Sequence, residues 1–275
     1  MSDLAVKGLV LGTEVVKYVR DHPQTVNATW DMISALLKKR KRVVVTGMKW
    51  AGKTVLCDFL TGKGYEEGYV PPDSSVRQED ARMPRPKGRE GFVLSTIPGD
   101  DSLPRRSSLD ELLGGGETIT GVMHVVSNGF VAPRSGVARE LMERDHATVD
   151  ELRTAMLDAE VENLGETLRA LEAYWLRTRR PLWLLIVLTK TDLWSLTQRE
   201  VFEHYTRKSR FARDLSALRA RIGSLNLDLR WTVAATVQED FVWTKRQARV
   251  ESALSKEQRD AYVRLLRAQL YELVG

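Results

Sequence analysis

Apolar residues form short continuous runs along the chain, and the run LWLLIVL at residues 182–188 is one of them. Runs of this kind, bounded by turn residues, predict strands buried on both faces, as the central strands of parallel sheets are. Shorter runs predict further strands at 43–45, 91–96, 122–126 and 229–233. Helical segments lie between them, and such alternation is typical of a mostly parallel sheet with helices on both faces. We therefore expect a three-layer αβα fold.

The helical segments show apolar residues at every third or fourth position. One long helix is predicted from a capping box at Thr148 to the residue before Pro181. Its apolar stripe consists of Leu157, Val161, Leu164, Leu168, Leu171 and Trp175. We expect this stripe to pack on the sheet, because it contains barely enough heptads for a coiled coil. A second helix is predicted over 211–222, and a last one begins at Ser255. The inward face of the last helix is predicted to contain Tyr262, Leu266, Leu270 and Leu273.

Three segments fall outside this alternation. Residues 63–90 and 127–147 show no clear period and are predicted to be loops. Residues 1–39 contain two amphipathic stretches that are too charged to cross a membrane, and we expect a helical extension in front of a domain of residues 40–275. Two alternatives stay open for this extension. It either packs permanently on the domain as a helical hairpin, or docks through residues 1–42 on a partner or an anionic membrane surface.

The candidate chemistry lies directly after the first predicted strand. Gly47, Gly52, Lys53 and Thr54 meet the pattern G-x-x-x-x-G-K-[ST], whose glycines let backbone N–H groups turn inward around phosphate oxygens. The lysine of this pattern reaches the β- and γ-phosphates, the hydroxyl binds Mg²⁺, and the next helix offers its positive N-terminus to the anion. The strand before this loop and the helix after it supply the required context, so we predict a nucleotide site.

A second motif indicates which base is bound. Thr189, Lys190, Thr191 and Asp192 stand at the carboxyl end of the run at 182–188. An aspartate there can accept hydrogen bonds from the N1–H and N2–H₂ groups of guanine, and adenine offers no such pair. The lysine stem can lie across the base plane while its ammonium braces the phosphate loop.

The two motifs together resemble those of the Ras-like GTPase superfamily. The loop GMKWAGKTVL is most similar to that of the Arf group and of the signal-recognition-particle receptor β subunit. The resemblance covers about residues 42–275 in element order, and Ala234, Ala235 and Thr236 stand where the family has S-A-K, so that Ala235 would offer its N–H to the guanine oxygen. It implies a Ras-like P-loop fold that binds GTP or GDP with Mg²⁺. The nucleotide site implied in this way contains Gly47, Lys49, Trp50, Ala51, Gly52, Lys53, Thr54, Val55, Gly99, Thr189, Lys190, Asp192, Ala234 and Ala235.

The sequence departs from this family at groups that support hydrolysis. Thr96 stands where the family's D-x-x-G motif has the aspartate that holds Mg²⁺ through water, and Asp100 stands where many members have a water-positioning glutamine. The family's switch segment supplies a threonine that binds Mg²⁺, and no threonine stands between Gly64 and Glu90 here. Ser74 or Ser75 is left for this role. By the resemblance, the metal ligands are Thr54, Ser75 and Thr96, and the groups that act on the phosphates are Lys53, Lys49 and Asp100.

Composition narrows the function classes. The net charge is +5, but the basic residues are spread along the chain without a nucleic-acid module, so no nucleic-acid partner is expected. A single cysteine, Cys57, excludes an internal disulfide framework and fits a reducing, cytoplasmic compartment. His124 lies within a predicted strand, where a packed, hydrogen-bonded histidine is commoner than a catalytic one.

The leading hypothesis is a guanine-nucleotide-binding protein of Ras-like fold, a slow GTPase that acts as a switch read by a protein effector or regulator. Residues 63–90 and 97–118 would be its switch segments. The alternative is a pseudo-GTPase that serves as a protein-interaction scaffold. An ATP-dependent kinase or ATPase is disfavoured by Asp192 and by the lack of an acidic residue at the end of the strand at 92–96.

Overall fold

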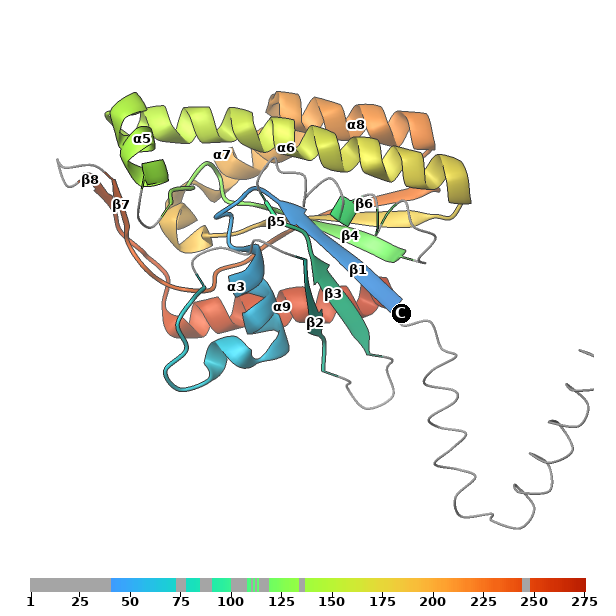
Figure 1. Ribbon diagram of the computed structural model, residues 1–275, viewed down its shortest axis with the longest axis horizontal. Coiled ribbons are helices and arrows are strands. Elements are labelled where there is room, and N and C mark those ends of the chain that lie inside the picture. Colours follow the sequence, from blue (N-terminus) through green and yellow to red (C-terminus); the bar gives the residue numbers. More distant parts are fainter. Residues whose placement is uncertain are drawn as a thin grey trace, which may run out of the picture. The chain divides into compact units, whose positions relative to one another are not determined.

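The structure is a computed structural model of the chain (Figure 1). It describes residues 41–72, 78–84, 91–99, 108–109, 111, 113, 119–133, 137–243 and 248–275. The described residues from Lys41 onward belong to one compact unit. The predicted helical extension 1–39, Ser74, Ser75 and Asp100 lie outside the described residues.

A six-stranded sheet forms the middle layer, in the order β2-β3-β1-β4-β5-β6. Its strands are β1 Lys41–Gly47, β2 Glu79–Arg82, β3 Phe92–Thr96, β4 Ile119–Val126, β5 Leu182–Leu188 and β6 Leu227–Val233. All neighbouring strands are parallel except β2, which pairs antiparallel with β3. The prediction of a mostly parallel α/β sheet is confirmed.

The strand β5 shows how the two faces of the sheet are covered. Leu184, Ile186 and Leu188 join one apolar cluster, and the alternate residues Trp183 and Leu185 join the other. Helices α6 Val149–Thr178 and α8 Arg210–Ile222 cover the first face, and α3 Lys53–Thr61 and α9 Lys256–Val274 cover the second (Figure 1). The layers are therefore helix, sheet and helix, as predicted.

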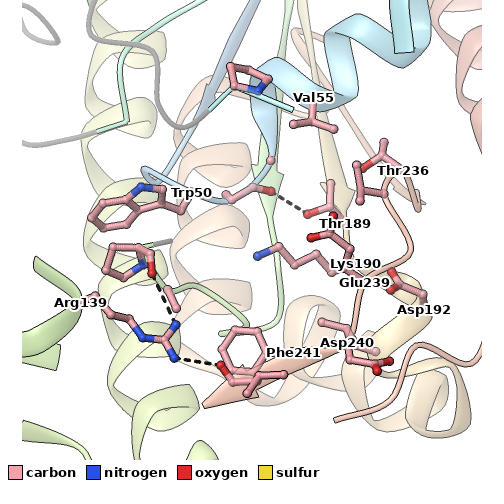
Figure 2. Close-up of a pocket in the computed structure, with 18 residues that line it drawn as sticks. Trp50, Val55, Arg139, Thr189, Lys190, Asp192, Thr236, Glu239, Asp240 and Phe241 are labelled. Carbon is pink, nitrogen blue, oxygen red and sulfur yellow. Dashed lines mark hydrogen bonds between the residues drawn. The ribbon is translucent and has the colours of Figure 1, made fainter. Parts of the chain in front are cut away.

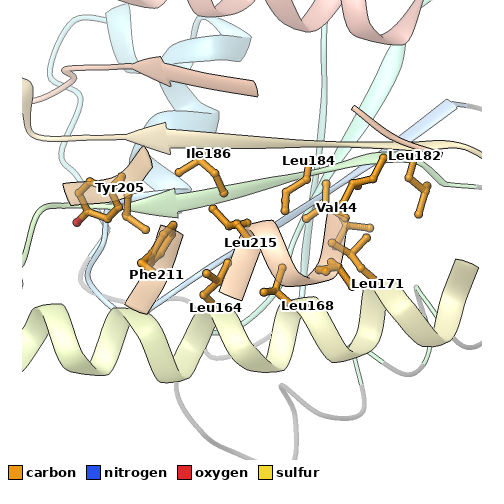
Figure 3. Close-up of a cluster of buried hydrophobic side chains, with 14 of the residues drawn as sticks. Val44, Leu164, Leu168, Leu171, Leu182, Leu184, Ile186, Tyr205, Phe211 and Leu215 are labelled. Atoms are coloured by element: carbon orange, nitrogen blue, oxygen red, sulfur yellow. The ribbon is translucent and has the colours of Figure 1, made fainter. Parts of the chain in front are cut away.

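The long helix α6 places its apolar stripe on the sheet. Figure 3 shows Leu164, Leu168 and Leu171 facing strand residues and Leu215 of α8 in one cluster, so the prediction of packing on the sheet is confirmed. The predicted inward face of α9 is partly wrong. Its buried residues are Val263, Leu266, Leu270, Tyr271 and Val274, whereas Tyr262 and Leu273 are half-buried. The buried stripe is thus rotated by about one residue, because α9 meets the sheet along spacings of three, four and four.

Two of the predicted loops contain regular elements. The segment 63–90 contains β2, whose sequence EDAR lacks apolar alternation because β2 lies at the edge of the sheet, with exposed or half-buried side chains. The segment 127–147 contains the helix α5 Val137–Asp145, whose nine residues are all exposed or half-buried although Val137, Leu141 and Met142 recur at helical spacing. Both loop predictions are wrong at these positions.

The remaining elements are short and stand mostly near the carboxyl ends of the strands. They are the 3-10 helices Lys63–Tyr65, Thr191–Leu193 and Ser195–Thr197, the helix α7 Gln198–Glu203, the π-helix His204–Lys208 and the hairpin of β7 Phe241–Trp243 with β8 Ala248–Val250. Among the helices that the structure describes, none has both the length and the apolar character to span a bilayer.

Candidate functional site

The phosphate-loop pattern forms the turn between β1 and α3. Gly47 has a φ of 132°, and a Cβ there would lie 2.2 Å from the Val125 carbonyl oxygen, so only glycine fits. Gly52 also has positive φ, at 92°, and so does Trp50, at 61°. A left-handed tryptophan is uncommon and indicates a backbone that is held by its surroundings. The glycines of the pattern are therefore required by the path of the chain.

Lys53 lies inside this loop. Its side chain is buried, and its Nζ donates to the carbonyl oxygens of Gly47 at 2.9 Å and Met48 at 2.8 Å. The helix α3, which begins here, has no acidic residue in its first turn and no side-chain cap from the described residues. Its N-terminal N–H groups and positive dipole end therefore favour an anion.

Gly99, after β3, rests against the same loop. Its carbonyl oxygen accepts a hydrogen bond from the Lys49 N–H at 2.9 Å. A Cβ at Gly99 would lie 2.2 Å from the Lys49 nitrogen and 2.4 Å from the Lys53 Nζ. The structure thus brings Gly99, the last residue of the segment 96–99 that stands for D-x-x-G, against the predicted phosphate loop. The Lys49 ammonium lies 5.0 Å from the centre of the Trp50 ring, a cation–π contact.

A cavity of about 360 Å³ opens beside this loop (Figure 2). Both predicted motifs line it, the first through Trp50, Ala51, Gly52 and Val55 and the second through Thr189, Lys190 and Asp192. In Figure 2, Trp50 and Asp192 lie at opposite sides of this space. Sequence reasoning missed the other lining residues, which are Pro72, Ala132, Pro133, Arg139, Leu193, Val237, Glu239, Asp240, Phe241 and Val242, and it named Thr236 only as part of a motif.

Asp192 is a buried carboxylate in the wall of the cavity. Its side chain belongs to a residue that is 2% exposed, and burial raises its pKa above the ordinary value. Its Oδ2 accepts a hydrogen bond from the Ser252 hydroxyl at 3.0 Å. Its Oδ1 has no hydrogen-bond partner among the described residues. A buried acceptor without a partner costs free energy, and a ligand with a suitably placed donor would recover it.

Thr189 joins the second motif to the first. Its hydroxyl lies 2.9 Å from the Ala51 carbonyl oxygen, as the dashed line in Figure 2 shows, and 2.9 Å from the Val126 carbonyl oxygen, and it can donate to either. The Lys190 ammonium, expected against the phosphate loop, donates to the Phe130 carbonyl oxygen. Thr189 thus makes a contact of this motif with the phosphate loop.

The segment predicted to replace S-A-K is tied to the same motif. Ala234 and Ala235 are fully buried, and the Thr191 hydroxyl donates to the Ala234 carbonyl oxygen at 2.9 Å. Thr236, the next residue, reaches the cavity. A contact from the Ala235 N–H to a base stays a prediction.

The predicted metal ligands form a neutral donor set. Thr54 is in the first turn of α3, and the Thr96 hydroxyl lies 3.4 Å from the Cys57 Sγ, whose pKa burial raises to about 12. Among the described residues, no cluster of three or more His, Cys, Asp or Glu side chains could hold a metal. These residues fit a magnesium ion that takes its charged ligands from bound phosphates and a hydroxyl from Thr54. His124 is buried and shares a 2.9 Å hydrogen bond with Thr46, as expected for a packed histidine.

Glu160, on α6, holds the turn that follows β4 and leads toward the site. Its Oε1 accepts the N–H groups of Ser127 at 2.9 Å and Gly129 at 3.2 Å, and its Oε2 accepts the Tyr205 hydroxyl. This turn leads to Phe130, whose carbonyl oxygen binds Lys190. Burial raises the pKa of Glu160. Its only sequence signal is a glutamate beside an apolar stripe, which is more often a surface residue.

Two segments that are far apart in the sequence close another side of the cavity. The guanidinium of Arg139, on α5, lies 4.5 Å from the centre of the Trp243 ring of β7 and donates to the Val242 carbonyl oxygen at 2.9 Å. Phe130 and Phe241 make an edge contact at 5.4 Å. The helix α5 and the β7–β8 hairpin therefore form one wall together.

Comparison with known proteins gives matches in structure alone. No protein-family model matches the sequence, and neither does any curated protein. One structural match is the signal recognition particle receptor SRb–GTP/SRX complex from Chaetomium thermophilum, with 14% identity, 72% of this chain and 94% of the other covered, and a TM-score of 0.48. A probable GTP-binding protein, EngB, matches at 13% identity over 85% of this chain and 98% of its own, with a TM-score of 0.46. The small GTPase Arl6 from Trypanosoma brucei, with a bound nucleotide analogue, matches at 12% identity over 84% and 98%, with a TM-score of 0.37.

Proposed function

We propose that this protein binds a guanine nucleotide in the cavity between its two motifs and hydrolyses GTP slowly, as a nucleotide-dependent switch. The observation that carries the proposal is the Asp192 carboxylate, which belongs to a residue that lines the cavity and has one buried oxygen, Oδ1, without a partner among the described residues. Guanine presents two adjacent donors, N1–H and N2–H₂, that a carboxylate accepts. Adenine would leave the acceptor unpaired, which disfavours an ATP-dependent kinase or ATPase.

The phosphates would lie on the loop between Gly47 and Lys53. The N-terminus of α3 favours their charge, and the Lys53 ammonium can exchange its two carbonyl contacts for phosphate oxygens. Magnesium, held by Thr54 and the phosphates and assisted by Thr96 and Ser75, would neutralise charge that develops on the phosphates during hydrolysis. Ser75 lies outside the described residues.

The contact of Gly99 with the loop supports the switch. A γ-phosphate beside Lys53 competes with Gly99 for the space next to the Lys49 N–H. Binding of GTP is therefore coupled to the position of the segment after β3, which an effector or regulator could read. Slow hydrolysis follows from the hydroxyl of Thr96, which stands where the family has a carboxylate. Asp100, which would stand in place of the water-positioning glutamine, lies outside the described residues.

A scaffold that hydrolyses nothing is the second candidate, and one observation favours it. Some polar groups of the loop are satisfied within the protein, since the Lys53 ammonium donates to two loop carbonyls and the Lys49 N–H donates to the Gly99 carbonyl oxygen. These contacts stabilise the loop without phosphate, which a pseudo-GTPase would need. In either case we propose a cytoplasmic protein that contacts a partner, with peripheral membrane contact through residues 1–42 as one form of that contact.

Nucleotide binding tests the proposal directly. The purified protein is denatured, its bound nucleotide is identified by chromatography, and GDP and ADP affinities are then measured by calorimetry. We expect a preference for GDP of at least about 100-fold, because ADP leaves the buried carboxylate unpaired. Equal affinities would refute the proposal.

A substitution of the same carboxylate sharpens this test. Asp192→Asn places an amide donor against the guanine donors, so we expect GDP affinity to fall by about 100-fold or more and xanthosine diphosphate to bind instead. The matched control is Asp228→Asn, on a half-exposed carboxylate that pairs with Arg230 outside the cavity. The control should keep the affinity of the wild type for GDP.

A further inference from the structure

The two oxygens of the Asp192 carboxylate have different surroundings. Oδ2 accepts the Ser252 hydroxyl at 3.0 Å, and Oδ1 has no partner among the described residues. The final torsion of an aspartate side chain is broad, so the plane of a carboxylate is set by its contacts. Beside a contact from the backbone of Asp192 itself, the Ser252 hydroxyl is therefore the hydrogen bond from another described residue that sets the plane of the carboxylate and the direction of Oδ1.

Ser252 is itself held firmly. Its N–H donates to Asp240 Oδ1 at 2.8 Å, and Asp240 forms an ion pair with Arg249 of β8. The N–H of the next residue, Ala253, donates to the Asp192 carbonyl oxygen at 3.0 Å. The segment 252–253 thus binds both the backbone and the side chain of Asp192. Because the backbone of Ser252 is fixed by these contacts, its hydroxyl can hold the Asp192 carboxylate in one orientation.

We propose that Ser252 is a positioning residue for guanine recognition, which holds the Asp192 carboxylate through Oδ2 and turns Oδ1 toward the base. Each carboxylate oxygen can accept two hydrogen bonds, so Oδ2 can bind Ser252 and a base donor together. Both base donors then meet a carboxylate in a fixed plane. This inference rests on the proposed guanine site. It adds a specificity residue that is 60 positions from Asp192 and belongs to neither motif.

The effect of Ser252 should appear in the discrimination between bases that differ by one donor. Inosine diphosphate has the N1–H of GDP but lacks the 2-amino group. A carboxylate in a fixed plane gains from the second donor, whereas one that rotates gains less. Loss of Ser252 should therefore reduce the preference for GDP over inosine diphosphate, a ratio that general destabilisation would leave unchanged.

The experiment measures the affinities of four full-length proteins for GDP, inosine diphosphate and ADP by calorimetry. They are the wild type, Ser252→Ala, Ser252→Thr and Ser255→Ala. Ser252→Thr keeps the hydroxyl at a half-buried position. Ser255→Ala removes a nearby serine hydroxyl that caps α9 by accepting the Gln258 N–H, and it serves as the control for lost stability.

We expect Ser252→Ala to bind GDP about tenfold more weakly than the wild type and to lose most of the preference over inosine diphosphate. Ser252→Thr should retain both properties, and Ser255→Ala should bind all three nucleotides as the wild type does. The inference is overturned if Ser252→Ala keeps the wild-type ratio, or if Ser255→Ala shows the same losses. A wild type without preference for GDP over ADP refutes the guanine proposal itself, and this inference falls with it.

Discussion

Glu160, which holds the turn after β4, should control both the stability of the fold and the shape of the site. Glu160 is 1% exposed and accepts hydrogen bonds from two backbone N–H groups and the Tyr205 hydroxyl. Glu160→Ala leaves these donors unpaired in the core. A buried donor without a partner costs about 1–3 kcal/mol, so we expect a loss of about 3–5 kcal/mol in the free energy of unfolding.

Glu160→Gln should cost far less. The amide oxygen still accepts the N–H groups of Ser127 and Gly129, and the difference between a charged and a neutral acceptor is about 1 kcal/mol. The matched control is Glu162→Gln, two residues along the same helix, where an exposed carboxylate pairs with Arg210 at 2.6 Å. Such a surface pair contributes at most about 1 kcal/mol.

The pH dependence of unfolding gives a second measurement. Burial raises the pKa of Glu160, so the folded protein holds this proton more tightly than the unfolded chain does. The stability that results is present below the ordinary carboxyl pKa and is lost as the pH rises through the raised value. We expect the wild type to lose up to about 1.4 kcal/mol per pH unit within that window relative to Glu160→Gln. His204, whose pKa is lowered by burial, is present in both proteins and largely cancels in the difference.

The assay is urea unfolding followed by tryptophan fluorescence and circular dichroism, at several values from about pH 5 to about pH 8. GDP affinity is measured alongside, because the turn held by Glu160 leads to the carbonyl that binds Lys190. Glu160→Ala should weaken GDP binding, and Glu160→Gln should preserve it. A loss below about 1 kcal/mol in Glu160→Ala, or parallel pH profiles of the wild type and Glu160→Gln, would refute the reasoning.

Four further predictions concern turnover, two residues of the phosphate loop and the N-terminal residues. Without an acidic residue at Thr96, we expect the purified protein to hydrolyse GTP at about 10⁻⁴ to 10⁻³ s⁻¹, and a rate near 1 s⁻¹ without a partner would show an unidentified catalytic group. If Lys49 supplies a cation to the phosphates, Lys49→Ala should slow single-turnover hydrolysis at nearly unchanged GDP affinity, and wild-type values of both would make it a surface residue. Trp50 fluorescence should change on nucleotide binding, because Trp50 lines the cavity. Flotation with anionic liposomes should distinguish the two roles of residues 1–39. If the segment docks on membranes, the protein floats with the liposomes. If the segment is a packed hairpin, the protein floats in neither nucleotide state, and removal of residues 1–39 unfolds the domain.

The order of the elements could be predicted from the sequence because each depends on local patterns. A buried strand such as Leu182–Leu188 requires a continuous apolar run, and a helix on the sheet requires the stripe of α6. The two motifs could be located for the same reason, since glycines at positive φ and a strand end are local features. The edge strand β2 was missed because its side chains are exposed or half-buried and show no apolar alternation. The helix α5 was missed because its apolar positions, although at helical spacing, extend over only nine residues.

The environment of the site depended on contacts between distant segments. That Asp192 is buried, with one oxygen bound to Ser252, follows from the return of the chain after the β7–β8 hairpin. The contact between Arg139 and Trp243 joins residues about a hundred positions apart, and no spacing rule predicts it. Residue types and their periods thus determined the layers and the loop that can bind phosphate. The tertiary structure alone decided which polar atoms are buried and which of them have partners, because burial is a property of the assembled chain and not of any segment.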